Sequence, residues 1–245
     1  MKPNLGLLLF IAIPFLPILF SASSAWNGRE NPIIVEVNEY FKAMSRFESQ
    51  TQKESLELLY HKGQAVATKL VQILELLSEA DYDSAVTQMK GYLLSREEII
   101  FVEPDISFFK DLSKTRGLEG DTSFFNFMGH LKPDNVWPAF IEQQTDYSGC
   151  TIFGKGILTG LYEEAVSFRY RYPSMYDSDI DHAIGQIKYA LTSSTCACGD
   201  SSSVIKEFQS FLNMFPSADI APQINERVLE IRERRARIRF NCISG

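Results

Sequence analysis

The most distinctive spacing in this chain of 245 residues belongs to its four cysteines, Cys150, Cys196, Cys198 and Cys242. Cys196 and Cys198 are separated by a single alanine within the serine-rich stretch SSTCACGDSSS. Two thiols at this spacing could hold a metal ion, form a redox pair, or contribute to two structural disulfides. The redox state of the compartment in which the chain folds decides among these chemistries.

Two further stretches combine acidic residues at spacings that could support chemistry. In DSDIDH (177–182) oxygens alternate as in the opening of an EF-hand, but His182 stands where that loop needs glycine, and Lys188 where it needs a bidentate glutamate. Glu142 and Asp146 could lie on one helix face, as a carboxylate pair acting on the cell wall. Spacing alone supports that pair, and acids at a helix start also cap backbone amides. We therefore predict no catalytic residue and no metal ligand.

The N-terminus indicates export. A basic start with Lys2 precedes an apolar run (residues 5–20), and Ser23 and Ala25 occupy the small-residue positions of a cleavage site before Trp26. This layout is typical of a secretory signal peptide. An uncleaved membrane anchor is the alternative, because the apolar run is long for a signal peptide.

We expect residues 1–25 to be removed on export, which leaves no stable membrane anchor and a protein that is periplasmic or secreted. The apolar run is shorter than the roughly 20 residues that a spanning helix needs, and Pro14 and Pro17 interrupt it. The whole chain has a formal net charge of −7 at pH 7. We expect no nucleic acid partner, because binding to phosphates requires an excess of positive charge.

In an oxidising compartment, an even number of cysteines indicates disulfides. A bridge between Cys196 and Cys198 would close a small, strained ring, so each should bond a distant cysteine instead. The pairing that we favour is Cys150–Cys196 with Cys198–Cys242. Each bridge would close a loop of about 45 residues and contribute on the order of 3–4 kcal/mol. The sequence lacks the C-x2-C spacing and clustered histidines of zinc sites and the C-x-x-C spacing of redox dithiols, and we predict no cofactor.

The elements that must position these residues are helical almost throughout. Apolar residues recur three and four apart between Glu54 and Ser78, for example, which predicts a long amphipathic helix. A shorter helix is expected to follow, and the run EEIIFVEP, which ends at Pro104, is the one convincing strand. Segments starting at Asp105 and Asp121 each contain a Phe-Phe pair and indicate two short helices with these rings in the core.

The C-terminal half contains an internal repeat. The stretch YPS at 172–174 recurs as FPS at 215–217, a period of 43 residues, and each copy lies between two predicted helices. With Ala-Pro at 221–222 opening the next helix, this joint resembles the tetratricopeptide-like helical hairpins of bacterial envelope proteins. The resemblance covers about 80 residues. It implies stacked helical hairpins with a groove that holds a protein or peptide partner.

These patterns predict an all-α fold. We expect an antiparallel helical bundle over residues 26–150 and tetratricopeptide-like hairpins over residues 151–245, with the disulfides joining the loop before one hairpin to the end of the chain. A plain antiparallel helical bundle is the alternative for the repeat region.

Four residues are expected to contact a partner. Trp137 lies in a predicted turn before Pro138, and Arg232, Arg235 and Arg239 lie at the end of the last predicted helix. Glutamates interleave with these arginines, which favours a solvated face with ion pairs between neighbouring turns. A docking surface for an acidic partner is the alternative.

We therefore predict an exported, non-catalytic binding or scaffold protein that recognises a protein or peptide partner in the cell envelope. An inhibitor or immunity protein that neutralises an envelope-acting enzyme is the first alternative, and a cell-wall hydrolase is the second. Sequence motifs of serine hydrolases, zinc proteases and nucleotide-binding loops do not occur in the chain.

Overall fold

The structure, a computed structural model, describes residues 32–96, 100–145 and 148–242. The predicted signal peptide lies outside these residues, and so does Asp146. None of the helices formed by the described residues has the length and apolar character needed to span a bilayer.

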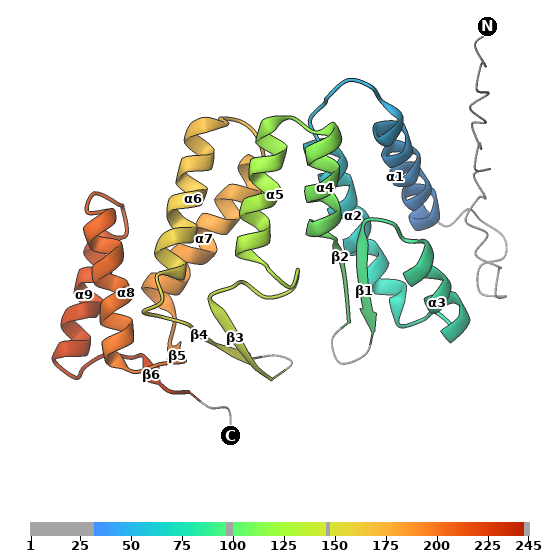
Figure 1. Ribbon diagram of the computed structural model, residues 1–245. Coiled ribbons are helices and arrows are strands. Elements are labelled where there is room, and N and C mark those ends of the chain that lie inside the picture. The colour runs from blue at the N-terminus through green and yellow to red at the C-terminus, as the bar shows by residue number, and fades with distance from the viewer. Residues whose placement is uncertain (1–31, 97–99, 146–147, 243–245) are drawn as a thin grey trace, which may run out of the picture.

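The helices form a row in which consecutive members pack as antiparallel pairs (Figure 1). In chain order they are α1 (Pro32–Ser49), α2 (Glu57–Leu74), α3 (Glu79–Gln88), α4 (Ile106–Arg116), α5 (Glu119–Leu131), α6 (Ile157–Arg171), α7 (Asp177–Ser193), α8 (Ser201–Met214) and α9 (Ala221–Arg232). Helix α1 packs on α2, α4 on α5, α6 on α7, and α8 on α9. Contacts of α1 with α4, of α5 with α6, of α6 with α8, and of α7 with α9 join these hairpins into one array.

Two sheets accompany the helices. Their strands are β1 (Tyr92–Arg96), β2 (Ile100–Pro104), β3 (Ile141–Thr145), β4 (Ser148–Thr151), β5 (Cys196–Ala197) and β6 (Arg239–Phe240). Strands β1 and β2 form an antiparallel hairpin that packs on α2. The second sheet has the order β3-β4-β5-β6 and lies below α6, α7 and α8 in Figure 1; β3 and β4 are antiparallel, whereas β4, β5 and β6 are parallel.

The prediction of an all-α fold is wrong, because the described residues contain these two sheets. The run EEIIFVEP does supply a strand, β2. The sequence pattern predicts that the preceding helix continues to Leu93, into the partner strand β1, but α3 ends at Gln88, and Gly91 turns the chain with a φ of 83°. Glycine adopts this conformation without steric penalty. The chain then pairs as a hairpin, with Tyr92 opposite Pro104.

The second sheet replaces a predicted helix and a predicted loop. The segment after Pro138 forms β3, so Glu142 lies in a strand and not on a helix face. Strands β5 and β6 contain two residues each, too few to show an alternating pattern in the sequence. They form only because distant segments meet: Ala197 pairs with Thr151 on one side and with Phe240 on the other.

The hydrophobic core extends through the whole row of helices, from α1 to the segment after α9. At its centre the ring of Tyr176 stacks on that of Phe124, with centroids 3.6 Å apart and planes 6° apart. The prediction that the Phe-Phe pairs belong to the core is confirmed, because Phe109, Phe124 and Phe125 are fully buried and Phe108 packs against them. Large aromatic rings bury much apolar area each, and this cluster joins α2, α4, α5 and α7.

A buried carboxylate holds the ends of several helices together. Asp121, at the start of α5, is fully buried and accepts hydrogen bonds from the amides of Leu56 (3.0 Å) and Leu118 (2.7 Å) and from the hydroxyl of Tyr176 (2.6 Å). Burial, together with the charge of Asp121, raises the pKa of the Tyr176 phenol. The phenol therefore stays protonated and remains a donor at neutral pH, and the segments before α2, α5 and α7 are tied to one point.

A second buried carboxylate caps α6. Glu207 of α8 is 1 % exposed and accepts hydrogen bonds from the amides of Gly154 (2.9 Å), Gly156 (2.8 Å) and Thr159 (3.1 Å), and from the Thr159 hydroxyl (2.9 Å). Gly156, at the N-cap, has no side chain that could satisfy these donors. Glu207 therefore supplies the acceptors and the negative charge that a helix N-terminus favours.

Replacing Glu207 by alanine should lower the free energy of unfolding by about 3 kcal/mol, because several buried donors lose their acceptor at once. Urea denaturation followed by circular dichroism would measure this change. Glu226 is exposed on α9, and Glu226→Ala should stay within about 0.5 kcal/mol of the wild type. Equal losses in the two variants would contradict the capping role of Glu207.

Candidate functional site

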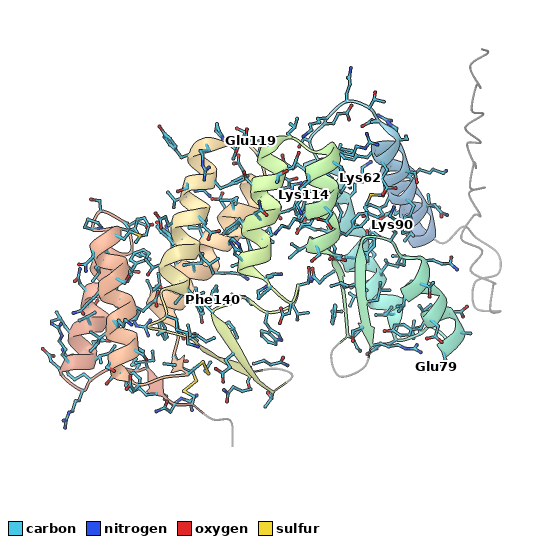
Figure 2. The ribbon with its side chains drawn as sticks, in the orientation of Figure 1. Lys62, Glu79, Lys90, Lys114, Glu119 and Phe140 are labelled. Atoms are coloured by element: carbon cyan, nitrogen blue, oxygen red, sulfur yellow. A yellow bond between two sulfur atoms is a disulfide. The ribbon has the colours of Figure 1, made fainter. Side chains whose placement is uncertain are left out.

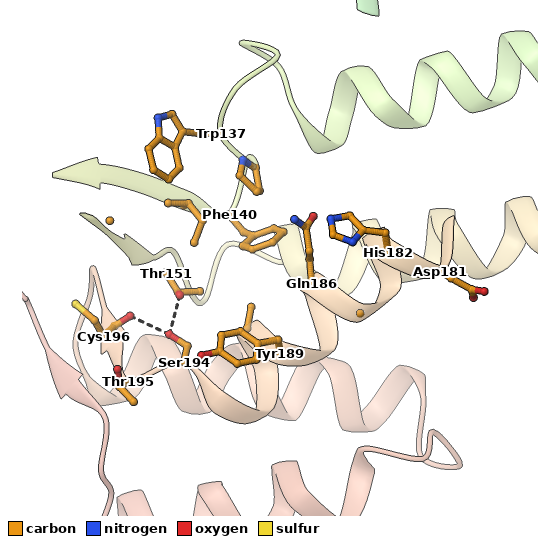
Figure 3. A pocket seen from close by; sticks show the side chains of 15 residues that line it. Trp137, Phe140, Thr151, Asp181, His182, Gln186, Tyr189, Ser194, Thr195 and Cys196 are labelled. Atoms are coloured by element: carbon orange, nitrogen blue, oxygen red, sulfur yellow. Dashed lines mark hydrogen bonds between the residues drawn. The ribbon is translucent and has the colours of Figure 1, made fainter. Parts of the chain in front are cut away.

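A groove with a volume of about 920 Å³ lies between the β3–β4 hairpin and one face of α7. Most of its wall is aromatic or aliphatic. Trp137, Phe140 and Ile141 come from the segment that enters β3, and Tyr189 comes from α7; Figure 2 labels Phe140 in the whole molecule. Figure 3 shows Trp137 and Tyr189 on opposite sides of the groove. Its size and its apolar lining are typical of a ligand-binding cleft.

The pleat of the β3–β4 hairpin decides which of its residues reach the groove. Ile141 lies opposite Thr151 in the ladder, and both line the groove. Because side chains alternate between the two faces of a strand, Glu142 and its partner Cys150 lie on the other face. One face of the hairpin therefore forms the groove, and the other carries an exposed carboxylate and a disulfide.

Helix α7 forms the opposite wall with His182, Gly185, Gln186 and Tyr189, which recur three and four residues apart and share one face. Gly185 leaves space in this wall, since a Cβ at this position would meet nothing within 4 Å beyond its own helix. Glycine inside a helix is less favourable than alanine by about 1 kcal/mol. The helix is thus locally weakened at the position where the groove is open.

Two polar atoms at the groove lack hydrogen-bond partners among the described residues: Oε1 of Gln186 and Nε1 of Trp137, both buried. An unsatisfied buried polar group costs about 1–3 kcal/mol. The hydroxyls at the other end of the groove are satisfied, because those of Thr151 and Ser194 lie 2.7 Å apart and Ser194 donates to the Cys196 carbonyl (Figure 3). A bound molecule could satisfy the acceptor on Gln186.

The groove carries little charge. Lysine and arginine are absent from the described residues that line it. Asp181 is ion-paired with Arg169, and His182 is exposed at the rim. This lining favours an uncharged, apolar group, because burying an unpaired charge against it would be unfavourable.

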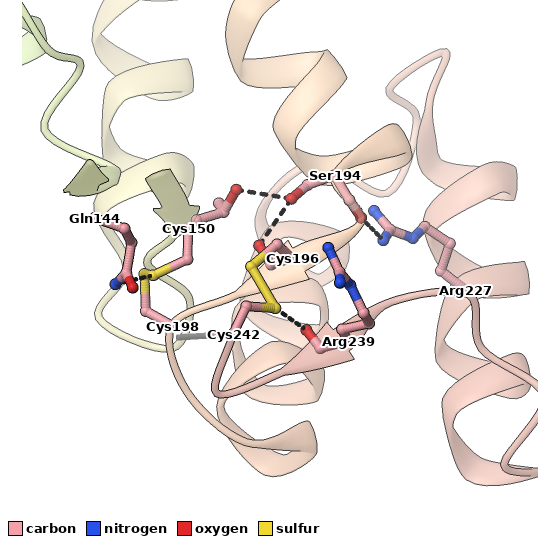
Figure 4. Close-up of a disulfide and its surroundings, with 9 residues drawn as sticks. Gln144, Cys150, Ser194, Cys196, Cys198, Arg227, Arg239 and Cys242 are labelled. Atoms are coloured by element: carbon pink, nitrogen blue, oxygen red, sulfur yellow. Dashed lines mark hydrogen bonds between the residues drawn. A yellow bond between two sulfur atoms is a disulfide. The ribbon is translucent and has the colours of Figure 1, made fainter. Parts of the chain in front are cut away.

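The four cysteines form two disulfides, Cys150–Cys198 and Cys196–Cys242 (Figure 4). The prediction that all four are bridged and that Cys196 does not bond Cys198 is confirmed, but the favoured pairing, Cys150–Cys196 with Cys198–Cys242, is wrong. The register of the parallel strands is the reason. Thr151 pairs with Ala197, and the amide of Cys198 donates to the Thr151 carbonyl (3.0 Å), which brings Cys198 to Cys150.

The disulfides hold the sheet wall of the groove to the end of the chain. Their Cα atoms are 5.0 and 5.9 Å apart, within the usual range for a bridge. Beside them, Arg227 of α9 donates to the carbonyl of Leu191 in the last turn of α7 and to that of Ser194, which follows the helix; Figure 4 shows the bond to Ser194. Burial lowers the pKa of the Arg227 guanidinium, which remains a cation suited to a helix C-terminus. The end of α7 and the strands β4, β5 and β6 are therefore fixed together.

The structure separates the residues predicted to contact a partner. Trp137 lines the groove, whereas the three arginines line no part of it. The predicted last helix ends at Arg232, so Arg235 lies in the segment after α9 and Arg239 in β6. All three arginines are exposed. Arg235 pairs with Glu233, and no ion pair of Arg232 or Arg239 is formed within the described part of the chain.

The acidic stretches have structural roles or lie on the surface. Asp179 of α7 accepts hydrogen bonds from His61 (2.7 Å) and Gln64 (3.0 Å) of α2, which ties these helices together. Glu142 is exposed on β3. Among the described residues no group of three or more histidine, cysteine, aspartate or glutamate side chains is arranged to hold a metal ion.

Sequence reasoning identified Trp137 but missed the rest of the groove. Phe140 and Ile141 are assigned by their pattern to a short helix, and Gln186 and Tyr189 lie on the side of a helix that faces solvent until the hairpin covers it. One signal was present in the sequence. Gly185 interrupts an otherwise regular helical pattern, and such a glycine often marks a close approach or an open space.

Comparison with known proteins identified no match to this chain among protein-family models, curated proteins or solved structures.

Replacing Cys150 by alanine should leave a single free thiol at Cys198, because that is its partner. Alkylation of the oxidised variant, followed by fragmentation of the peptide that carries both Cys196 and Cys198, locates the label. The free energy of unfolding should fall by about 4 kcal/mol, the value expected for opening a loop of this length. A label on Cys196 would contradict the pairing.

Proposed function

We propose that this chain is an exported, non-catalytic binding protein that recognises a protein or peptide partner through the groove between the β3–β4 hairpin and α7. The groove itself carries the proposal. It combines an apolar lining of cleft size with buried polar atoms that have no partner among the described residues.

The two disulfides indicate an oxidising environment, since such bonds persist outside the reducing cytosol. We place the protein in the periplasm or outside the cell, where the predicted signal peptide would direct it. The tetratricopeptide-like relationship of the hairpins α6–α7 and α8–α9 is part of the same proposal. Such arrays present extended concave surfaces to their partners.

The lining residues and the preformed walls of the groove favour binding. Its apolar side chains offer contact area, Gln186 offers a hydrogen-bond acceptor, and the charge of Asp181 is neutralised by Arg169. Its walls belong to a helix and a disulfide-linked sheet, so the groove is formed before a partner arrives. A preformed site loses less conformational entropy on binding.

Filling the groove should weaken partner binding without destabilising the fold. Gly185→Leu projects a side chain into the groove, and Gly160→Leu is a matched control, because Gly160 lies in α6 with equally open space and lines no part of the groove. Both changes replace a helical glycine by a good helix former and should stabilise by up to about 1 kcal/mol. Thermal unfolding of both variants would check this.

The probe is a random peptide library selected on the folded, oxidised protein. The change Trp26→Phe leaves Trp137 as the only tryptophan, so that its fluorescence reports binding at the groove. Selected peptides should bind the wild type and Gly160→Leu equally and bind Gly185→Leu at least about tenfold more weakly, a loss of about 1.4 kcal/mol. Equal binding to Gly185→Leu, or a selection that yields no peptide, would refute the proposal.

We propose the exposed arginines at the end of the chain as a second contact surface, for an acidic part of the partner. Arg232→Gln combined with Arg239→Gln should weaken binding of a polyglutamate peptide several-fold at low salt, because Arg232 and Arg239 have no ion pair within the described residues. Arg235→Gln should change this binding less, since Arg235 is paired with Glu233. Titration at two salt concentrations measures both effects. Binding that is independent of salt would contradict this role.

A further inference from the structure

Strand β3, beside the groove, has an open edge. It is the outermost strand of the sheet β3-β4-β5-β6, and no described strand pairs with its other side. An exposed edge presents unpaired backbone amides and carbonyls to which another extended chain can add. A segment that adds to this edge would be part of the partner that the proposed function requires, so this inference rests on the proposed function.

The ladder identifies the backbone groups that are available. The amide of Ile152 donates to the Phe140 carbonyl (2.8 Å), so Phe140 faces β4 with its backbone. Hydrogen-bonded and non-bonded pairs alternate in an antiparallel ladder, so Glu142 also faces β4 and Gln143 directs its amide and carbonyl to the open edge. Gln143 is the last residue of the regular ladder, because the register shifts between Gln143 and Thr145. The Ile141 amide is already used by the Pro138 carbonyl (2.8 Å). Gln143 is therefore the point at which an added strand can bond.

The pleat then dictates the side chains of the added strand. Its residue opposite Glu142 shares the face of Glu142, and its neighbours on either side share the face of Ile141, which is the groove face. The groove face is apolar and lacks lysine and arginine among its described residues. These neighbouring positions therefore suit uncharged, apolar side chains.

Charge complementarity decides which side chain suits the position of the added strand opposite Glu142. Glu142 is exposed, and within the described residues no cation is paired with it. The formal net charge of the whole chain is −7. A lysine or arginine opposite Glu142 would form a cross-strand ion pair, whereas a carboxylate there would be repelled.

We infer that β3 and the groove together bind an extended peptide segment of the pattern apolar–basic–apolar, which adds as a strand to the open edge of β3. Its backbone bonds to Gln143, its basic side chain faces Glu142, and its apolar side chains enter the groove beside Ile141 and Trp137.

Synthetic heptapeptides with blocked ends test this assignment on the full, oxidised protein carrying Trp26→Phe. One has Leu-Lys-Leu at its centre, a second has Leu-Glu-Leu, and a third is the first with its leucine amides N-methylated. Binding is followed by the fluorescence of Trp137. The Leu-Lys-Leu peptide should bind at least about fivefold more tightly than the Leu-Glu-Leu peptide, and N-methylation should weaken it at least about tenfold by removing backbone donors.

Variants of the chain separate the contacts. Glu142→Gln should remove the preference for lysine over glutamate, whereas Glu163→Gln, at an exposed position on α6, should preserve it. Loss of the preference in both variants, or in neither, would overturn the role of Glu142. Tight binding of the N-methylated peptide would overturn strand addition, and so would the absence of binding by all three peptides.

The library-selected peptides distinguish strand addition from the proposed function of the groove. If library-selected peptides lose affinity for Gly185→Leu but tolerate N-methylation and carry no basic residue, the groove is a binding site and strand addition is wrong. If they bind Gly185→Leu unchanged, the proposed function itself fails. Pairing of β3 with a second copy of the chain would also overturn the inference. Sedimentation equilibrium would reveal this pairing as a dimer that does not dissociate when peptide is added.

Discussion

Three segments that are distant along the chain must meet for the second sheet to exist, and two disulfides impose that meeting. Strands β5 and β6 contain two residues each, and so short a pairing is marginal in water. Cys150–Cys198 joins β4 to the residue after β5, and Cys196–Cys242 joins β5 to the residues after β6. The sheet wall of the groove, and with it the position of Ile141, follows from these two bonds.

The helical row depends on a different device, the buried carboxylate. Asp121 accepts hydrogen bonds from amides before α2 and α5 and from the phenol of Tyr176 before α7. Glu207, which belongs to the neighbouring hairpin, accepts hydrogen bonds from the amides at the N-terminus of α6. In both cases a negative charge lies where helix dipoles and unpaired amides favour it. Adjacent hairpins therefore have a fixed relation to one another, and α7 is held at both ends.

The groove results from these two constraints acting on α7. The carboxylate network holds the start of the helix, while Arg227 and the disulfide-linked strands hold its end. Between these points the β3–β4 hairpin stands across from one face of α7 and leaves the space at Gly185 open. The hairpin thereby turns a helix face that would otherwise meet solvent into one wall of a cleft.

Much of the helical structure was determined by the sequence alone, because helix signals are local. The apolar stripe of α2, the Phe-Phe pairs of α4 and α5, and the stops at Pro173 and Pro216 after α6 and α8 each depend on residues within a few turns. The bridged state of the four cysteines was also accessible, since it depends on their number and on the compartment. Trp137 could be singled out, but the other residues of the groove could not.

Only the tertiary structure decided the second sheet, the pairing of Cys150 with Cys198, and the groove. Each of these depends on contacts between segments more than forty residues apart, such as Thr151 with Ala197, and no local pattern encodes them. A two-residue strand has no periodicity to detect, and Gln186 looks like any polar residue on a helix surface until β3 lies across from it. Local propensity determines which segments become helices, whereas register and packing determine which of their faces meet.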